Sequence, residues 1–457
     1  MVRKLLESER GFALMTTLGI MLVLTILAVG LMMVAQNDLT MTVKSKRLTQ
    51  ALHVAEAGID KALWQLKKTQ NLPASFEVET PLGIAYVTAS QDATNTWLWR
   101  ITSRGVTEDG VKRTIKVTVF NLSYWDMFFA GGTSQSLTAG GGGIVGTTSV
   151  HGPFFVRGNL ELSGTSSIRK GPLFVRDGDI ILASAAASIG TADEPIDVFV
   201  SGSAPTDSSQ FHANLLSHHV PNIVLPDLVL SDMKNHLNDA KEQSAVPYTN
   251  TPYVNCQTDY YKLVDDDLSV SIPLGSGDVP LTISSSTVAF GNPTTDDFAW
   301  DPTTKTLTVK GTVFVDGPVQ LGNATGPTLN IKYRGNGAIV ANGDINIYGK
   351  LLPSDNFPSD DFLGLVTPTN IYIHTQSSNP SDPETSPPDI AGALYGKIGV
   401  TIEKNILIKG GLVAGTLAFN HPNVHLVSQP QLSLYLPEAM PGGTQYILQS
   451  TGWHEAQ

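Results

Sequence analysis

The side chains of this chain that could do chemistry are carboxylates gathered in short runs. Asp296 and Asp297 stand just before Asp301, and further runs lie at 265–267 and 360–361. A pair of carboxylates can act as acid and base in the cleavage of glycosidic bonds, and clustered carboxylate oxygens can bind Ca²⁺. We interpret the runs as exposed acidic turns, retain Asp296, Asp297 and Asp301 as a candidate Ca²⁺ site, and rank catalysis last.

The other reactive residue types form no catalytic constellation. His218 and His219 are the only adjacent histidine pair, and neighbours on a strand point apart. The one cysteine, Cys256, excludes an intramolecular disulfide and a metal site built from several cysteines. No motif of a metalloprotease, a serine hydrolase, a P-loop protein or a dinucleotide-binding protein occurs. The sequence therefore predicts a protein that is not an enzyme and has no cofactor apart from the candidate Ca²⁺.

Four basic residues form a candidate nucleic-acid patch. Arg157 and Arg176 occupy matching positions of a repeated block, and Arg169 and Lys170 lie between them. The background is acidic, since residues 126–457 carry 15 Lys and Arg against 31 Asp and Glu, whereas the chain before them carries 14 against 10. Such a surface repels a nucleic-acid backbone unless basic side chains cluster locally. We expect a solvated face here and keep DNA binding as the alternative.

These residues must be positioned by a chain that begins with a long apolar helix. No charged residue occurs from Phe12 to Ala35, a stretch that spans about 36 Å as a helix and can cross a hydrocarbon core of about 30 Å. Basic residues precede it, which places residues 1–11 in the cytoplasm and the bulk of the chain outside. Apolar residues then recur at steps of three and four. The helix is therefore expected over 12–72, with 12–35 transmembrane.

Two short motifs mark this helix. Gly11 and Phe12 follow a basic residue, and Ala-Glu-Ala-Gly occupies 55–58. These features resemble the processing site of type IV pilins and type II secretion pseudopilins, and the A-E-A-G stretch of PilX-type minor pilins. The resemblance implies that 1–11 is a leader peptide, that a prepilin peptidase cuts between Gly11 and Phe12, and that the new amine of Phe12 is methylated. It also implies contacts of the helix with other minor and major pilins.

Thr16 departs from the pattern of that family. Major pilins carry a glutamate at the fifth mature position, which neutralises the N-terminal ammonium of a neighbouring subunit, and here that position is Thr16. A buried charge without a partner is costly in an apolar helix bundle. Thr16 therefore favours a subunit at the tip or one that initiates assembly, with a subunit inserted in the filament shaft as the alternative.

The chain beyond the helix is expected to be β structure. Alternating patterns over 73–125, with a turn at Glu108–Gly110, predict a small antiparallel sheet of the kind that forms a pilin head. From residue 126 to 457, short aliphatic runs alternate with glycine, and the block Gly152–Leu162 recurs from Gly171. Repeats of about 20 residues predict a right-handed β-solenoid, with a β-sandwich as the alternative. We expect insertions in it near 203–300 and 353–390.

The fold class is thus α+β, and the function that follows is structural. We expect a minor pilin at or priming the tip of a type IV pilus, which presents its solenoid to a surface, an adhesin or another partner. The alternatives are a DNA-binding competence pilin and the large tip pseudopilin of a type II secretion system. Before assembly the chain is expected in the inner membrane by a single span, with its bulk in the periplasm, and afterwards at the pilus tip.

Overall fold

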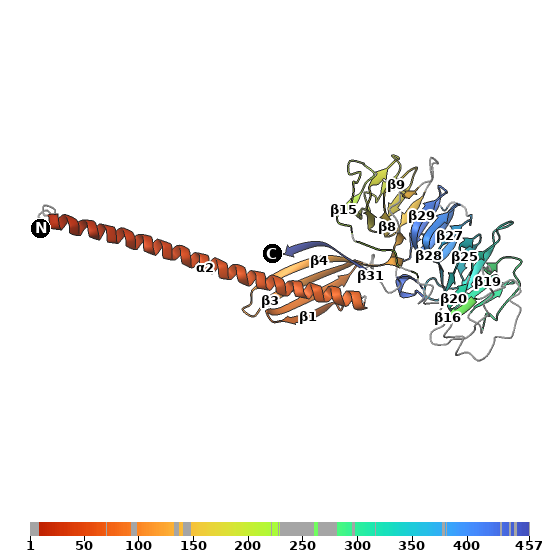
Figure 1. The fold of residues 1–457 in the computed structure, drawn as a ribbon, viewed down its shortest axis with the longest axis horizontal. Coiled ribbons are helices and arrows are strands. Elements are labelled where there is room, and N and C mark those ends of the chain that lie inside the picture. The colour runs from red at the N-terminus through yellow and green to blue at the C-terminus, as the bar shows by residue number, and fades with distance from the viewer. Residues whose placement is uncertain are drawn as a thin grey trace. The chain divides into compact units, whose positions relative to one another are not determined.

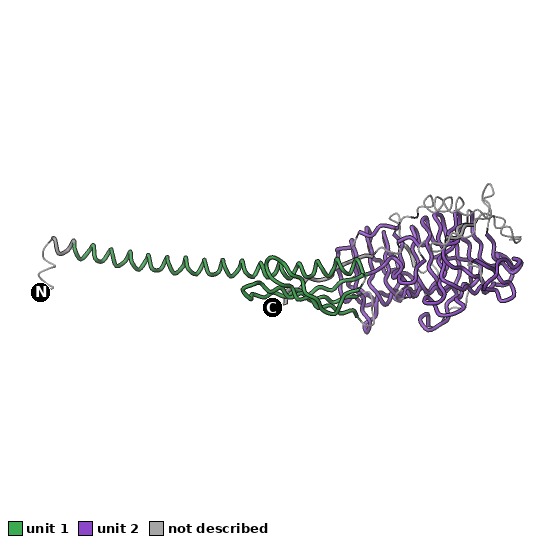
Figure 2. The backbone as a smooth tube through the Cα atoms, turned by 90° about the horizontal axis from the view of Figure 1, so that it is seen from below, with its two compact units in different colours: residues 1–121, 448–457 green, residues 122–447 purple. Residues whose placement is uncertain are grey.

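The computed structural model describes residues 9–69, 71–92, 98–131, 137–139, 148–220, 222–226, 228, 260–263, 281–294, 298–315, 317–376, 380, 382–429, 432–437, 440–442 and 446–456. The chain forms two compact units, shown in separate colours in Figure 2. Unit 1 comprises residues 1–121 and 448–457, and unit 2 comprises residues 122–447. Figure 1 labels their helices and strands.

Unit 1 is built on one long helix, α2 (Glu9–Thr69), which confirms the predicted helix to within a few residues of its end. Its last third packs on a sheet through small and aliphatic side chains. The residues of α2 that are buried are Ala51, Val54, Ala55, Gly58, Ile59, Ala62 and Leu66. Together with the inward residues of the sheet they form a separate hydrophobic core.

The sheet of unit 1 is antiparallel, as predicted, but it contains a strand from the far end of the chain. Its order is β1 (Ser75–Thr80), β2 (Gly83–Gln91), β3 (Leu98–Thr107), β4 (Lys112–Ser123) and β31 (Tyr446–Ala456). The predicted appendage over 126–457 is therefore wrong at its C-terminal end, because β31 pairs with β4. Unit 2 is an insertion between two neighbouring strands of unit 1.

Two glycines allow the helix and the sheet of unit 1 to approach closely. A Cβ atom on Gly105 of β3 would lie 2.2 Å from the carbonyl oxygen of Ala51 and 2.5 Å from the amide nitrogen of Ala55. A Cβ atom on Gly58 would lie 2.3 Å from the hydroxyl of Ser103. The A-E-A-G run thus has a packing role, because Ala55 and Gly58 lie against β3.

Unit 2 contains a first stack of short parallel strands in three columns. Successive strands of a column come from successive copies of the sequence repeat, so that Phe154 pairs with Leu173 and Arg157 with Arg176. The columns are β5 (Phe128–Ala130), β8 (Phe154–Arg157), β11 (Leu173–Arg176), β14 (Ile196–Val200) and β15 (Ala213–Ser217); β7 (Ser149–His151), β10 (Ser167–Arg169) and β13 (Ser188–Ile189); and β6 (Leu137–Ala139), β9 (Leu160–Leu162) and β12 (Ile180–Leu182).

A second stack of parallel columns follows along the chain. Its columns are β20 (Gly311–Val315), β23 (Asn336–Ala341) and β26 (Phe362–Thr367); β17 (Leu281–Ile283), β21 (Val319–Leu321), β24 (Ile345–Ile347) and β27 (Asn370–Ile373); and β19 (Thr306–Val309), β22 (Asn330–Arg334) and β25 (Lys350–Pro353). All three columns continue onto the long strands β28 (Ile390–Ile402) and β29 (Ile406–Phe419). Two strands, β16 (Tyr260–Leu263) and β18 (Phe298–Asp301), are antiparallel to their neighbours β20 and β19.

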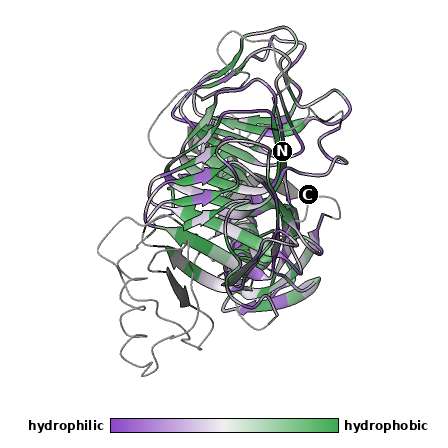
Figure 3. Ribbon diagram, turned by 90° about the vertical axis from the view of Figure 1, so that its right-hand side faces the viewer, coloured by the Kyte–Doolittle hydropathy of each residue, from purple (hydrophilic) through white to green (hydrophobic). Residues whose placement is uncertain are grey.

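The two stacks meet in the middle of unit 2 rather than end to end in chain order. The last long strand, β29, pairs with β5, the first strand of the unit, and β30 (Val424–Ser428) pairs with β7. The chain therefore enters unit 2 at its centre with β5, the first stack follows as far as β15, and the second stack ends at β29, beside β5. Figure 3 shows the stacked strands, in which many residues have the green colour of hydrophobic side chains. One hydrophobic core runs through both stacks.

One outward row of side chains in unit 2 is buried as well. It runs strand by strand through Val340, Val366, Tyr395, Val413, Phe129, Phe155, Phe174 and Phe199, each at most 1% exposed. The segment 222–228 contributes to its cover. Tyr395 donates a hydrogen bond of 2.5 Å to the carbonyl of Pro226, and Ile223 and Leu228 are buried. The unit begins with the 3₁₀ turn η1 (Tyr124–Asp126), and a second turn, η2 (Leu432–Leu434), lies near its end.

The predicted insertions need correction. The span 203–300 contains β15, β16, β17 and β18, and 353–390 contains β26 and β27, so that paired strands of unit 2 run through both spans. The repeat was missed there because the connections differ in length while the strand pairing persists. Cys256 and the run 265–267 lie outside the described residues.

Candidate functional site

The candidate site is the first two thirds of α2, which is mostly apolar and exposed. Every large hydrophobic side chain from Leu14 to Val43 is exposed, from 47% at Val43 to 71% at Met21. Within the described part of the chain, this is the one helix that is long and apolar enough to cross a membrane, with a mean hydropathy of 2.7 in its most apolar window. Such a surface requires lipid or other apolar helices around it.

Two threonines of this segment fit an apolar surrounding. The hydroxyl of Thr17 donates to the carbonyl of Leu14 at 2.9 Å, and that of Thr25 donates to the carbonyl of Met21 at 2.7 Å. Threonine hydroxyls that bond to the preceding helical turn add no unsatisfied donor. The helix can therefore carry these residues in a bilayer or in a bundle of helices.

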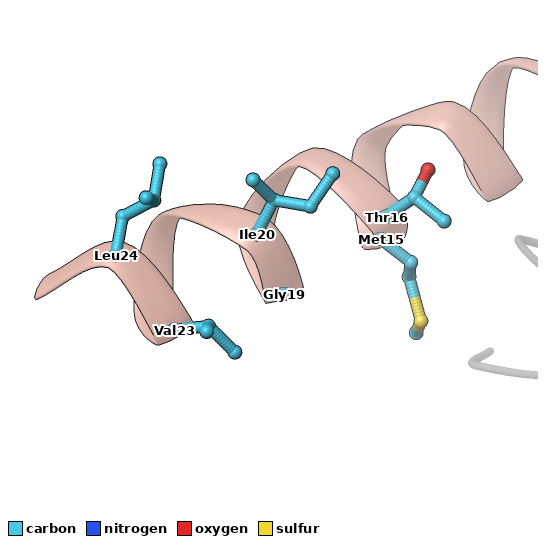
Figure 4. A pocket seen from close by; sticks show the side chains of 6 residues that line it. All are labelled: Met15, Thr16, Gly19, Ile20, Val23 and Leu24. Carbon is cyan, nitrogen blue, oxygen red and sulfur yellow. The ribbon is translucent and has the colours of Figure 1, made fainter. Parts of the chain in front are cut away.

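Thr16 lies on this bare surface, beside a notch. Figure 4 shows Met15 and Val23 on either side of Gly19, with Thr16, Ile20 and Leu24 along the next row. No atom lies within 4 Å of where a Cβ of Gly19 would stand. Thr16 brings a hydroxyl and no charge to this face. Gly11 and Phe12 belong to α2, but their side chains lie outside the described residues, so processing there stays a prediction.

The candidate nucleic-acid patch divides into two separate places in unit 2. Arg157 and Arg176 stand side by side at the ends of β8 and β11, as the repeat predicted. They share one carboxylate, because Asp177 lies 2.9 Å from Nε of Arg157 and 3.7 Å from Nε of Arg176. This arrangement reduces the positive charge that the pair offers to a polyanion.

Arg169 and Lys170 end a different column, on β10. The Lys170 ammonium pairs with Glu384 at 2.5 Å, and the same carboxylate accepts from Nδ1 of His151 at 2.8 Å. Burial alone would raise the pKa of Glu384, but the hydrogen bonds and charges of Lys170 and His151 lower it. The loop between β27 and β28 is thereby fixed to β7 and β10, and Lys170 has a structural partner.

A buried histidine beside this network makes the stability of unit 2 depend on pH. His425 of β30 faces Ser149 of β7, with its Nδ1 2.8 Å from the hydroxyl. Burial first, and the charge of His151 second, lower the pKa of His425 to about 4. The unfolded chain binds that proton near pH 6.5, so stability is lost as the pH falls from about 6.5 to about 4, by about 3 kcal/mol in total.

Asp126 has the opposite effect on the same unit. Burial raises its pKa to about 6, against hydrogen bonds from the Ser123 amide and from Ser433 that lower it. The native state therefore takes up this proton first, and stability is gained as the pH falls from about 6 to about 4. The two groups offset each other in the wild-type protein.

We therefore expect single variants to tilt the pH profile in opposite directions. On acidification from about pH 7 to about pH 4.5, His425→Asn should gain unfolding free energy and Asp126→Asn should lose it, each by about 2 to 3 kcal/mol relative to wild type. Urea unfolding of the full chain in detergent at both pH values measures this. If the unfolding free energy changes equally with pH in the two variants, neither group titrates as described.

Of the remaining sequence candidates, Asp301 ends β18, and Asp361 is buried, so that the interpretation of the run 360–361 as an exposed turn is wrong for that residue. The carboxylate of Asp301 accepts from the Thr303 amide and the Thr304 hydroxyl, both at 2.8 Å, and these bonds, the hydroxyl first, lower its pKa. Asp296 and Asp297 lie outside the described residues, so the Ca²⁺ hypothesis stays untested. Within the described ranges no group of three His, Cys, Asp or Glu could hold a metal ion. His218 and His219 follow β15 in a loop.

The sequence reasoning missed two features of these units. Gly105 was not singled out, although a glycine inside an alternating strand often marks a close backbone approach. The repeated block contained Phe155 and Phe174, but their burial on the outward side of the column could not be seen from an alternating pattern.

Comparisons with known proteins give a structural likeness only. No protein-family model matches the sequence, and no curated protein matches it. Three chains of solved structures match, among them the crystal structure of the competence-associated pilin ComZ from Thermus thermophilus. It is 16% identical, covers 89% of this chain and 97% of its own, and has a TM-score of 0.44. At that score and identity we transfer nothing from it to this chain.

Proposed function

We propose that this chain is a minor pilin that sits at or primes the tip of a type IV pilus. The observation that carries the proposal is the division of α2. Its large hydrophobic side chains from Leu14 to Val43 are exposed, whereas apolar side chains from Ala51 to Leu66 pack on an antiparallel sheet. A helix of this kind can leave a bilayer and join a bundle of like helices without unfolding its head.

The placement at the tip is supported by Thr16 and by unit 2. A subunit in the shaft has a neighbour whose N-terminal ammonium would lie near position 16, and a threonine cannot neutralise that charge. We propose that the parallel columns of unit 2 form a β-solenoid, inserted between β4 and β31, which is presented for adhesion or partner contact. An insertion of this size is more easily carried once at an end than at every subunit.

DNA uptake is the weaker candidate. The paired Arg157 and Arg176 favour it, but both lie against Asp177, and Lys170 is engaged with Glu384. We propose no enzymatic step for the chain.

The test is the position of the subunit on the filament. In the source organism, an epitope-labelled wild-type copy should give immunogold label at pilus ends. Thr16→Glu should move label into the shafts, because the new carboxylate can pair with the ammonium of the next subunit, whereas Thr16→Gln, of similar size and without charge, should stay at the ends.

Two results would overturn the tip placement. Label at intervals along wild-type shafts would show a shaft subunit that tolerates Thr16. Normal pili without any label, together with a secretion defect in the deletion strain, would show the tip pseudopilin of a secretion system instead.

A further inference from the structure

We infer that one outward face of unit 2 binds neutral oligosaccharides. The face lies on β21, β24, β27 and β28, and we call it the polar face. Its members are partly exposed and carry amide, hydroxyl, phenol, imidazole or carboxylate groups. They are Gln320, Asn346, Tyr348, Asn370, Tyr372, His374, Thr401 and Glu403.

Strand register brings these groups together from distant parts of the chain. Gln320 pairs with Asn346, Asn346 with Tyr372, and Tyr372 with Thr401. Adjacent strands lie about 4.8 Å apart, so polar groups repeat along the face at about that spacing. This repeat is comparable to one sugar unit of an extended glycan, so that successive sugars could meet successive strands.

The aromatic groups of the polar face are held in place. The rings of Tyr348 and His374 stack with centroids 4.4 Å apart and planes 9° apart, and the ring of Tyr372 lies 6.3 Å from that of His374. His374 is fixed from both sides, since Nδ1 lies 2.7 Å from Glu403 and Nε2 lies 3.4 Å from Oδ1 of Asn346.

The backing of the face is rigid. The side chains that alternate with it point into the core and are at most 1% exposed, as at Ile347, Ile371, Ile373 and Ile402. Groups mounted on a packed sheet lose little conformational entropy when a ligand binds. The polar face is thus organised before a ligand arrives.

The chemistry of the groups selects a neutral, hydroxyl-rich ligand. Half-exposed rings offer apolar contact to the C–H groups of a sugar, and amides and hydroxyls exchange hydrogen bonds with its hydroxyls. The carboxylate of Glu403 is engaged with His374, and that of Asp344 at the margin accepts from the backbone N–H of Asn370. A polyanion finds no row of cations there among the described residues.

Another column of the same stack provides the contrast. The exposed residues of β22 are Asn330, Lys332 and Arg334, so that face is charged. The difference lets a control variant be made in the same stack. The inference gives a ligand class to the adhesive role and rests on that proposed function for its biological meaning, but binding by the purified protein does not depend on where the pilus carries it.

Calorimetric titration of the full chain in detergent tests the inference, with the hexasaccharides of cellulose, chitin and starch as neutral probes and a hexagalacturonate as the anionic probe. At least one neutral probe should bind, with an affinity that is the same at low and high salt. Tyr372→Ala and Asn346→Ala should each weaken it about tenfold or more, which corresponds to about 1.4 kcal/mol, whereas Lys332→Ala should leave it unchanged.

Folding and binding can be separated in this experiment. Tyr372→Phe keeps the ring and loses the hydroxyl, so it should keep the thermal midpoint of wild type while weakening the binding. Three results would overturn the inference: no neutral probe binds at any soluble concentration, binding is unaffected by Tyr372→Ala and Asn346→Ala, or only the anionic probe binds and does so in a salt-dependent way. None of these results changes where the immunogold label is found on the pilus, so the binding inference can fail while the proposed position at the tip stands.

Discussion

Gly105→Ala is expected to destabilise unit 1 by more than about 3 kcal/mol. The added Cβ would lie 2.2 Å from the carbonyl oxygen of Ala51 and 2.5 Å from the amide nitrogen of Ala55. Both atoms belong to the backbone of α2, so no side chain can rotate to make room. The helix must move away from β3, and the contacts of Ala55 and Ile59 with the core of unit 1 are lost. Urea unfolding of the full chain in detergent measures the change.

Two glycines of the same unit provide graded controls. Gly58→Ala meets the Ser103 hydroxyl, which can rotate, and the Ala85 Cβ at 2.9 Å, which cannot, but it gains about 1 kcal/mol of helix propensity and meets no backbone atom of another element, so its cost should be intermediate. Gly110→Ala meets nothing within 4 Å. Its only cost should be about 1 kcal/mol, because a residue with a side chain is strained at the positive φ of this position. If Gly105→Ala lowers the unfolding free energy no more than Gly110→Ala does, α2 does not lie against β3 as described.

The sequence predicts unit 1 well because its signals are local. The charge-free run from Phe12 to Ala35 and the three- and four-residue steps after it depend only on helix geometry, and α2 matches them. The alternation in 73–125 likewise predicts the antiparallel strands. The strand β31 could not be predicted, because nothing within its eleven residues states which sheet it joins. Pairing over more than 300 residues of chain is decided by the free edge of β4.

The interior of unit 2 was partly predictable, since the block Gly152–Leu162 and its glycines repeat with the strands. Gly152 and Gly171 precede β8 and β11, both with positive φ, where a side chain would be strained. The order of the strands was not predictable. A repeat shows that neighbouring copies stack, but it does not show that β29 returns to pair with β5. The polar face was missed for the same reason, as its residues share no motif and meet only through register.

Phe155→Ala is expected to cost unit 2 about 3 to 5 kcal/mol. The ring of Phe155 is fully buried, although it lies on the outward side of β8, and it stacks on the ring of Phe129 with centroids 4.7 Å apart and planes 11° apart. Phe129 belongs to β5, a three-residue strand that pairs with β29 of the second stack and β8 of the first. A cavity beside it removes packing where the two stacks join. Phe155→Leu, which keeps more of the volume, should cost less.

The matched control is Leu434→Ala, since Leu434 is 60% exposed and its truncation should change the unfolding free energy by less than about 0.5 kcal/mol. Because the chain has two compact units, the two large effects should fall on different transitions. Gly105→Ala should move the unfolding of unit 1 and Phe155→Ala that of unit 2. If Phe155→Ala costs no more than Leu434→Ala, the outward row is open to solvent, and the segment 222–228 does not cover it. If each variant moves both transitions, the units unfold together, and the insertion of unit 2 between β4 and β31 makes one cooperative unit of them.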